Sequence, residues 1–202
     1  MSPRLAALIA IVGAGLGMLA IVALMTTGLN RPLPISENVA KVQIGGPFTL
    51  TDHTGKQVTD ADFHGKFMLM FFGYTYCPDI CPTTLTDITD AMNLLGEQQE
   101  EVVPVFVTVD PERDTVEHLG EYVTFFHPRM VGLTGTLMQI SEVATAYKIY
   151  YRKGTLPEDD PEGYLVDHSS IAYLIDRNGD FVTHFSHGTT PEQMAQRIRE
   201  TL

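Results

Sequence analysis

Two continuous apolar runs constrain the fold more than any other feature of this sequence. The first, KFMLMFFGY, occupies residues 66–74, and the second, VVPVFVTVD, occupies residues 102–110. A run of strand length without polar alternation is typical of a strand that is buried on both faces. The sequence therefore predicts two central strands in the interior of an α/β domain.

Helical and extended patterns alternate along the rest of residues 43–202. Helices are predicted where apolar residues recur at helical spacing, over residues 82–95, 115–126, 136–150 and 192–202. Further strands are predicted in a hairpin at 47–59, at 130–133, and in a hairpin at 171–185 that turns at Asn178-Gly179. Residues 152–164 read as a polar, proline-containing insertion. This order predicts an α/β, thioredoxin-like fold with a central mixed sheet flanked by helices.

The N-terminal segment from Leu5 to Met25 is an uncharged apolar run of 21 residues. As a helix it spans roughly 30 Å, which matches a bilayer core, whereas the apolar region of a cleaved signal peptide usually has only about 7 to 15 residues. We therefore expect a transmembrane anchor at residues 5–25, after a cytoplasmic N-terminus at 1–4. A linker at 26–42 and one domain at 43–202 complete the expected organisation.

The predicted domain is strongly acidic. The charged residues before position 43 are Arg4, Arg31, Glu37 and Lys41. This leaves 10 basic and 24 acidic residues in the domain, a net charge of −14. Nucleic acids and anionic lipids are bound by basic patches, so this charge argues against a nucleic acid as partner. It suits a cation, or a partner protein with a positive face.

The two cysteines of the chain, Cys77 and Cys81, lie in the stretch FFGYTYCPDICPTTL. Their spacing is one residue wider than the CxxC pair of thioredoxin-type redox motifs. With Cys81 in the first turn of a helix and Cys77 in the loop before it, both sulfurs lie near a helix N-terminus, where thiol pKa values are lowered. Three hypotheses remain at this point: a structural disulfide, a redox-active pair and a metal site.

Three ordered motifs resemble the Sco/SenC family of membrane-anchored copper-binding proteins that assist cytochrome c oxidase assembly. They are GYTYCPDICPTTL at 73–85, VDPERDT at 109–115 and VDHSSIAYLID at 166–176. The resemblance extends from about residue 43 onward and implies a thioredoxin-like fold. It also implies that the copper ligands are Cys77, Cys81 and His168, with one ion per chain as Cu(I) or Cu(II).

Zinc is the rival metal for two cysteines and a histidine, although structural zinc sites normally have four protein ligands.

Asp79 lies between the cysteines and Asp167 precedes the histidine. The first is a candidate for metal release or partner contact and the second for orienting His168, but neither is counted as a ligand. The six other histidines are predicted to be surface or packing residues: His53, His64, His118, His127, His184 and His187.

The resemblance therefore implies a membrane-anchored copper metallochaperone that assists copper-site assembly in subunit II of cytochrome c oxidase. Other copper chaperones or thiol reductases are further expected partners. The main predicted function, delivery of copper, is not enzymatic. One alternative is a thiol-disulfide reductase in which Cys77 and Cys81 form a redox-active disulfide; another is a copper or redox sensor. The expected location is a bacterial inner membrane, spanned once with the domain in the periplasm, in preference to a mitochondrial inner membrane.

Overall fold

The computed structural model describes residues 13, 15–23, 25, 43–155 and 163–202, and the chain divides into two compact units, 1–42 and 43–202. In the first unit, residues 13, 15–23 and 25 are helical. No helix in the described part of the chain is both long enough and apolar enough to cross a membrane. Part of the predicted anchor, and all of the predicted N-terminus at 1–4 and linker at 26–42, lie outside the described residues.

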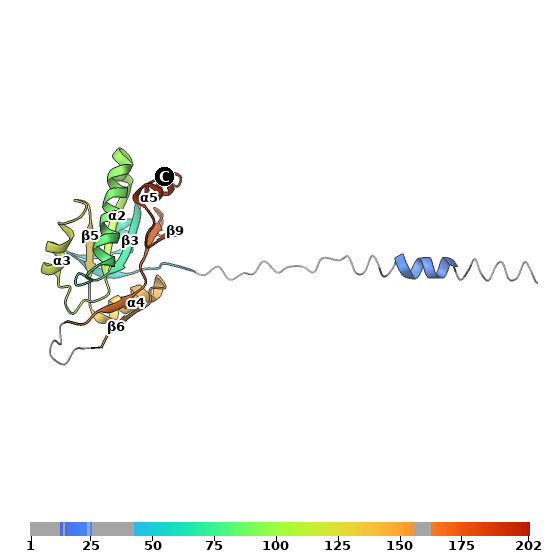
Figure 1. Cartoon of the computed structure of the whole chain (residues 1–202), viewed down its shortest axis with the longest axis horizontal. Helices are drawn as coiled ribbons and strands as arrows, with labels where there is room; N and C mark the ends of the chain where they lie inside the picture. Colours follow the sequence, from blue (N-terminus) through green and yellow to red (C-terminus); the bar gives the residue numbers. More distant parts are fainter. Residues whose placement is uncertain (1–12, 14, 24, 26–42, 156–162) are drawn as a thin grey trace, which may run out of the picture. The chain divides into compact units, whose positions relative to one another are not determined.

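The second unit is built on a mixed sheet of seven strands, whose order is β2-β1-β5-β4-β3-β8-β9 (Figure 1). The two apolar runs are β3 (Phe67–Gly73) and β4 (Val102–Thr108), which pair in parallel at the centre. The remaining strands are β1 (Thr49–Asp52), β2 (Gln57–Thr59), β5 (Val131–Thr134), β8 (Ile171–Ile175) and β9 (Phe181–Ser186). Of these, β5 continues the parallel part, whereas β8 pairs with β3 in the antiparallel direction.

Helices cover both faces of this sheet, which explains why all seven residues of β3 are buried. Successive side chains of a strand point to opposite faces, and Phe71 packs against Phe106 whereas Phe72 packs against Tyr147. The face of Phe71 is covered by α2 (Ile80–Leu95) and α3 (Val116–Val123), with α5 (Pro191–Arg199) packed beside α2. The face of Phe72 carries α4 (Leu137–Ala146), for which Tyr147 is the C-cap.

The predicted α/β, thioredoxin-like fold with a central mixed sheet is confirmed, and the two predicted hairpins are β1–β2 and β8–β9. Two 3₁₀ helices, at Asp60–Phe63 and Gly96–Glu101, were not predicted. The helices predicted at 115–126 and 136–150 end earlier, at Val123 and Ala146.

The polar, proline-containing insertion predicted at 152–164 begins within a strand that was not predicted. A second, two-stranded sheet forms from β6 (Tyr151–Lys153) and β7 (Val166–His168), which pair antiparallel with Tyr151 opposite His168. Each strand has only three residues, too few for a hydrophobic period to be visible in the sequence. The pairing of the two segments, and not a local pattern, therefore defines these strands. Residues 156–162 of the insertion lie outside the described part of the chain.

Candidate metal centre

The cysteine loop leaves the carboxyl end of β3, the central strand. Because β3 ends at Gly73 and α2 begins at Ile80, Cys77 lies in the loop and Cys81 in the first helical turn. Cys81 is fully buried and Cys77 is partly exposed, and both thiols are free. One sulfur can therefore be reached from solvent while the other lies beneath it.

Gly73 provides the space for the buried sulfur. A Cβ atom at this position would lie only 2.7 Å from Cys81 Sγ and 3.0 Å from the ring of Phe106. Both neighbours are themselves fully buried, so neither has free space into which to move. A residue without a side chain is thus required where the strand meets the loop.

His168 approaches the two sulfurs from a distant part of the sequence. It ends β7, three residues before β8 begins, and the start of β8 lies beside the end of β3, with Ala172 opposite Phe71. His168 Nε2 lies 3.3 Å from Cys81 Sγ, and the candidate ligand atoms of Cys77, Cys81 and His168 all lie within 4.8 Å of one another. The structure therefore brings together the three residues that were predicted as ligands.

The imidazole ring of His168 is oriented by its neighbours. Its Nδ1 lies 3.2 Å from the carbonyl oxygen of Ser169, which can only accept a hydrogen bond, so Nδ1 carries the proton in the neutral ring. The lone pair of Nε2 then faces Cys81. Edge contacts with Phe71 and Tyr74, at centroid distances of 6.2 Å and 5.8 Å, hold the ring in this orientation.

The two thiols differ in acidity because they share a hydrogen bond. The Cys81 thiol and the backbone N–H groups of Asp79 and Cys81 donate to Cys77 Sγ, and these bonds lower the pKa of Cys77 to about 4. The same bond to Cys77, together with burial, raises the pKa of Cys81. Cys77 is therefore the thiolate of the pair, and its partial exposure makes it the first sulfur that an incoming metal or thiol would meet.

This arrangement is chemically suited to a soft metal ion. Two sulfurs and one imidazole nitrogen form the one cluster of histidine, cysteine and carboxylate ligand atoms among the described residues that could hold a metal ion. Thiolate favours Cu(I), and imidazole is accepted by Cu(II) as well as Cu(I). Because the Cys81 thiol must lose its proton to bind, metal uptake would release a proton.

The two aspartates beside the ligands take no part in the cluster. Asp79 is the exposed N-cap residue of α2. Asp167 is also exposed and faces Arg152 across the β6–β7 pair, with its carboxylate 3.5 Å from the guanidinium. The suggestion that Asp167 orients His168 is not supported, since the Nδ1 partner is the carbonyl of Ser169.

The sequence was also compared with known proteins, and a family model described as SCO1/SenC matches residues 36–202. The chain belongs to the SCO1/SenC family. A SCO2-like protein of Rickettsia prowazekii is 42% identical over 173 residues, which cover 85% of this chain and 83% of the relative.

Solved structures of SCO1/SenC proteins resemble this domain closely. Copper-bound ScoI of Arabidopsis thaliana has a TM-score of 0.73 at 42% identity and covers 78% of this chain and 96% of its own. Copper-bound ScoI of Bradyrhizobium japonicum has a TM-score of 0.72 at 43% identity, covering 79% and 99%. A more distant structure, at 25% identity and a TM-score of 0.61 over 79% and 92%, is BsSco, described as a Sco-family cytochrome c oxidase assembly protein with a disulfide switch.

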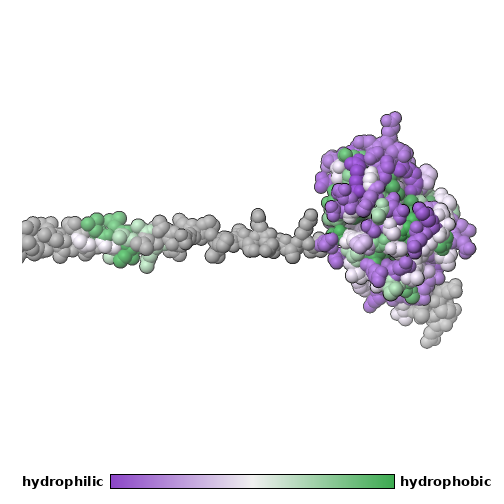
Figure 2. Space-filling model, turned by 180° about the vertical axis from the view of Figure 1, so that it is seen from behind, coloured by the Kyte–Doolittle hydropathy of each residue, from purple (hydrophilic) through white to green (hydrophobic). Residues whose placement is uncertain are grey.

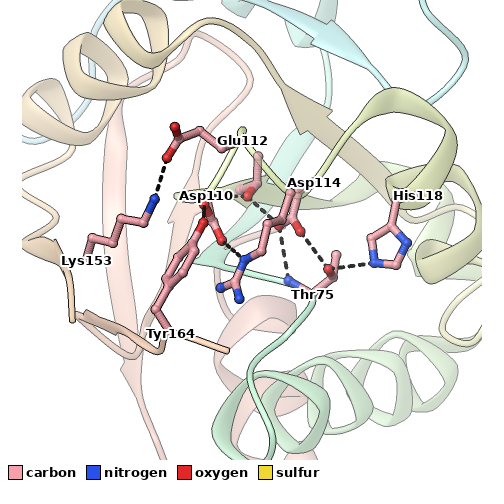
Figure 3. Close-up of polar contacts among 9 residues, drawn as sticks. Thr75, Asp110, Glu112, Asp114, His118, Lys153 and Tyr164 are labelled. Atoms are coloured by element: carbon pink, nitrogen blue, oxygen red, sulfur yellow. Dashed lines mark hydrogen bonds and ion pairs between the residues drawn. The ribbon is translucent and has the colours of Figure 1, made fainter. Parts of the chain in front are cut away.

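A buried carboxylate ties the cysteine loop of this SCO1/SenC protein to the sheet. Asp114, which is fully buried, accepts hydrogen bonds from the backbone N–H and the hydroxyl of Thr75, at 3.1 Å and 2.6 Å, and from the hydroxyl of Thr108, at 2.5 Å (Figure 3). Burial raises the pKa of Asp114 although these donors oppose the shift. Since the Thr75 hydroxyl donates to Asp114, it accepts from His118 Nε2 at 2.9 Å.

This network was not predicted from the sequence. Thr75 and Asp114 belong to two of the motifs, but no role was assigned to either residue. His118 was predicted to be a surface or packing residue, and its ring both stacks on Tyr76, at a centroid distance of 5.2 Å, and binds Thr75. His127 is a packing residue as predicted: it is buried, and its Nε2 lies 2.9 Å from Gln99 Oε1. A sequence signal for Asp114 did exist: two aspartates four residues apart, Asp110 and Asp114, directly follow a predicted central strand.

We predict that Gly73→Ala destabilises the domain through its contact with Cys81. Overpacking of a filled core costs about 1–3 kcal/mol, so the free energy of unfolding should fall by that amount in chemical denaturation. A Cys81→Ala background removes the closest of these contacts and leaves those with the rings of Phe106 and Phe71, at 3.0 Å and 3.1 Å, so the cost of Gly73→Ala should be smaller there. An equal cost in both backgrounds would show that the sulfur does not require the glycine.

We also predict that Thr75→Val lowers the free energy of unfolding by about 1.5–3 kcal/mol, because a hydrogen bond to a buried carboxylate is lost without a change of shape. Thr54→Val is the matched control, since the Thr54 hydroxyl donates to Asp52 over the same 2.6 Å but at an exposed site. The control should change stability by no more than roughly 0.5 kcal/mol. Denaturant titration of both variants decides, and similar losses in the two would contradict a special role for Asp114.

Proposed function

We propose that this protein is a membrane-anchored copper metallochaperone that holds one copper ion through Cys77, Cys81 and His168 and delivers it to cytochrome c oxidase. The observation that carries the proposal is the convergence of two sulfurs and one imidazole nitrogen within 4.8 Å. Two family members that are 42% and 43% identical to this chain have solved structures with copper bound. Their similarity supports copper as the cargo.

The ligand set favours copper over zinc. A structural zinc site is closed by four protein ligands, and the cluster in the described residues offers three. Two thiolates and an imidazole can hold either oxidation state of copper, with Cu(I) preferred by the sulfurs. An open site beside the partly exposed Cys77 also suits delivery, because an acceptor can replace the ligands one after another.

The copper-bearing subunit II of cytochrome c oxidase is the acceptor in this proposal, and the domain acts outside the cytoplasm. The description of the related BsSco as an oxidase assembly protein supports the oxidase as the destination. The apolar run from Leu5 to Met25 supports an anchor in a bacterial inner membrane. The domain's net charge of −14 suits an acceptor with a positive docking face.

A thiol-disulfide reductase that keeps the acceptor's cysteines reduced is the second candidate. Two free thiols of unequal pKa lie together, and the more acidic Cys77 is partly exposed, which is the arrangement that thiol exchange requires. The disulfide switch of BsSco supports redox chemistry within the family. The two functions differ in their need for His168, because exchange between Cys77 and Cys81 uses only the sulfurs.

We predict that the reduced domain, residues 43–202, binds one equivalent of copper in preference to zinc. His168→Ala should lower copper affinity by more than the roughly 10- to 100-fold that loss of a hydrogen-bond partner of a metal ligand costs, since a ligand itself is removed. Equilibrium dialysis with copper and zinc in competition measures both effects. His184→Ala is the control, because His184 is exposed on β9 and lies in the middle of a strand away from the cluster.

Two results would count against this proposal. Preference for zinc, or two copper ions per chain, would rule out the proposed cargo or site. If His168→Ala no longer binds copper but still supports full oxidase assembly in cells, reduction of the acceptor's thiols is the main function.

We further predict that the full-length chain places residues 43–202 outside the cytoplasm. An alkaline phosphatase fused after Leu202 should be active, whereas β-galactosidase at the same position should be inactive, because each reporter works in only one compartment. The same fusions without residues 1–25 provide the control and should reverse this result. Activity of the cytoplasmic reporter alone on the full-length chain would contradict the proposed anchor.

A further inference from the structure

The VDPERDT segment supplies none of the three proposed ligands, yet its side chains contact both parts of the chain that carry them. Asp110 and Arg113 come from this segment, which follows β4. Tyr76 precedes Cys77 directly in the cysteine loop, and Tyr164 lies four residues before His168. We call the cysteine loop and the β7 segment that carries His168 the two arms of the site. Contacts among these four residues therefore connect the two arms.

Asp110 and Arg113 form a nearly buried ion pair that also binds Tyr164. Arg113 Nε donates to Asp110 Oδ2 at 2.5 Å, with 9% and 4% of the two side chains exposed. The hydroxyl of Tyr164 donates to the other oxygen, Oδ1, at 2.8 Å (Figure 3). Both oxygens of Asp110 are thus engaged, one by the arginine and one by the tyrosine.

The guanidinium group of Arg113 also lies against aromatic rings from both arms. Its central carbon is 3.6 Å from the centroid of the Tyr164 ring and 4.5 Å from that of Tyr76. Both distances are within the range of about 6 Å in which a cation over an aromatic face is attractive. Desolvation strengthens such contacts, and Arg113 and Tyr164 are both largely buried.

The arm that carries His168 needs an attachment of this kind. β6 and β7 form a two-stranded sheet outside the seven-stranded one, and an isolated pair of strands is marginally stable at best. Lys153 of β6 adds a second attachment, since its Nζ lies 4.0 Å from the centroid of the Tyr164 ring and 2.8 Å from Glu112 (Figure 3). That ion pair is largely exposed and therefore contributes little. The buried contacts of Arg113 are the stronger link.

We propose that Arg113 is a positioning residue, which with Asp110 and Tyr164 forms a clamp that holds His168 at bonding distance from a metal on Cys77 and Cys81. The inference rests on the proposed copper site and assigns a role to residues that do not touch the metal. When the clamp is broken, Cys81 keeps its position in the first turn of α2, and Cys77 keeps its position in the loop, which Thr75 still ties to Asp114. The imidazole loses its fixed place, and copper is then held by two sulfurs.

Arg113→Lys tests the clamp with a small change. Lysine keeps the positive charge beside Asp110 but lacks the flat group that stacks on two rings. Copper(I) affinity should fall by about 10- to 100-fold, the usual cost of removing a residue that orients a metal ligand. X-ray absorption at the copper edge should show two sulfur neighbours retained and the nitrogen neighbour lost.

The matched control is Arg177→Lys. Arg177 also lies over an aromatic ring, that of Phe67 at 4.7 Å, and pairs with Glu101 at 3.0 Å. This arrangement is at the opposite end of β3 from the cysteine loop. Copper affinity and the absorption spectrum of the control should equal those of the wild type.

Tyr164→Leu provides a second test, because it removes the ring and leaves the Arg113–Asp110 ion pair in place. It should produce the same loss of nitrogen and of affinity, with unfolding transitions recorded for each variant. If the wild type shows two sulfurs and one nitrogen while every variant that folds matches it, the clamp is refuted alone. If neither variant folds, these residues hold the domain and not the ligand, which also refutes it. A wild type that binds no copper, or binds it without nitrogen, refutes the proposed function itself.

Discussion

The antiparallel pairing of β8 with β3 determines where the site of this protein lies. A strand that runs antiparallel to its neighbour begins where that neighbour ends, and Ala172 near the start of β8 pairs with Phe71 near the end of β3. The cysteine loop leaves one strand and His168 enters the other at the same edge of the sheet. Residues 87 positions apart in the sequence are thereby brought to within 3.3 Å.

Three close contacts then refine the position of each proposed ligand. Gly73 leaves space for the buried sulfur of Cys81, Asp114 holds the loop before Cys77 through Thr75, and the carbonyl of Ser169 fixes which nitrogen of His168 faces the sulfurs. These contacts also contribute to the stability of the fold, because buried polar groups must be hydrogen-bonded and side chains in a filled core cannot be displaced. The result is a site with one sulfur buried and one accessible, which suits the proposed role of holding copper and releasing it to an acceptor.

Much of this arrangement could be predicted from local sequence patterns. The two apolar runs identified β3 and β4, and Asn178-Gly179 identified the β8–β9 hairpin, because burial and turn chemistry are encoded in a few adjacent residues. The proposed ligands were implied by the resemblance of three motifs to the Sco/SenC family, since the spacing of Cys77 and Cys81 alone left a disulfide, a redox pair and a metal site open. The β6–β7 pair and the contacts of Arg113 were missed, because each depends on which distant segment lies opposite. Helix ends such as Val123 were misplaced by a few residues, because the helical sequence pattern extends beyond the last residue that the tertiary packing keeps helical.

The central claim is that the fold places all three side chains before metal arrives. A crystal structure of the reduced, metal-free domain beside one of the copper-loaded domain tests this most directly. We predict that His168 Nε2 lies near Cys81 Sγ in both, with a single copper ion bound by the two sulfurs and this nitrogen, and with β3 and β8 unmoved. A metal-free structure in which His168 is far from the cysteines, or a copper ion that His168 does not bind, would contradict the account.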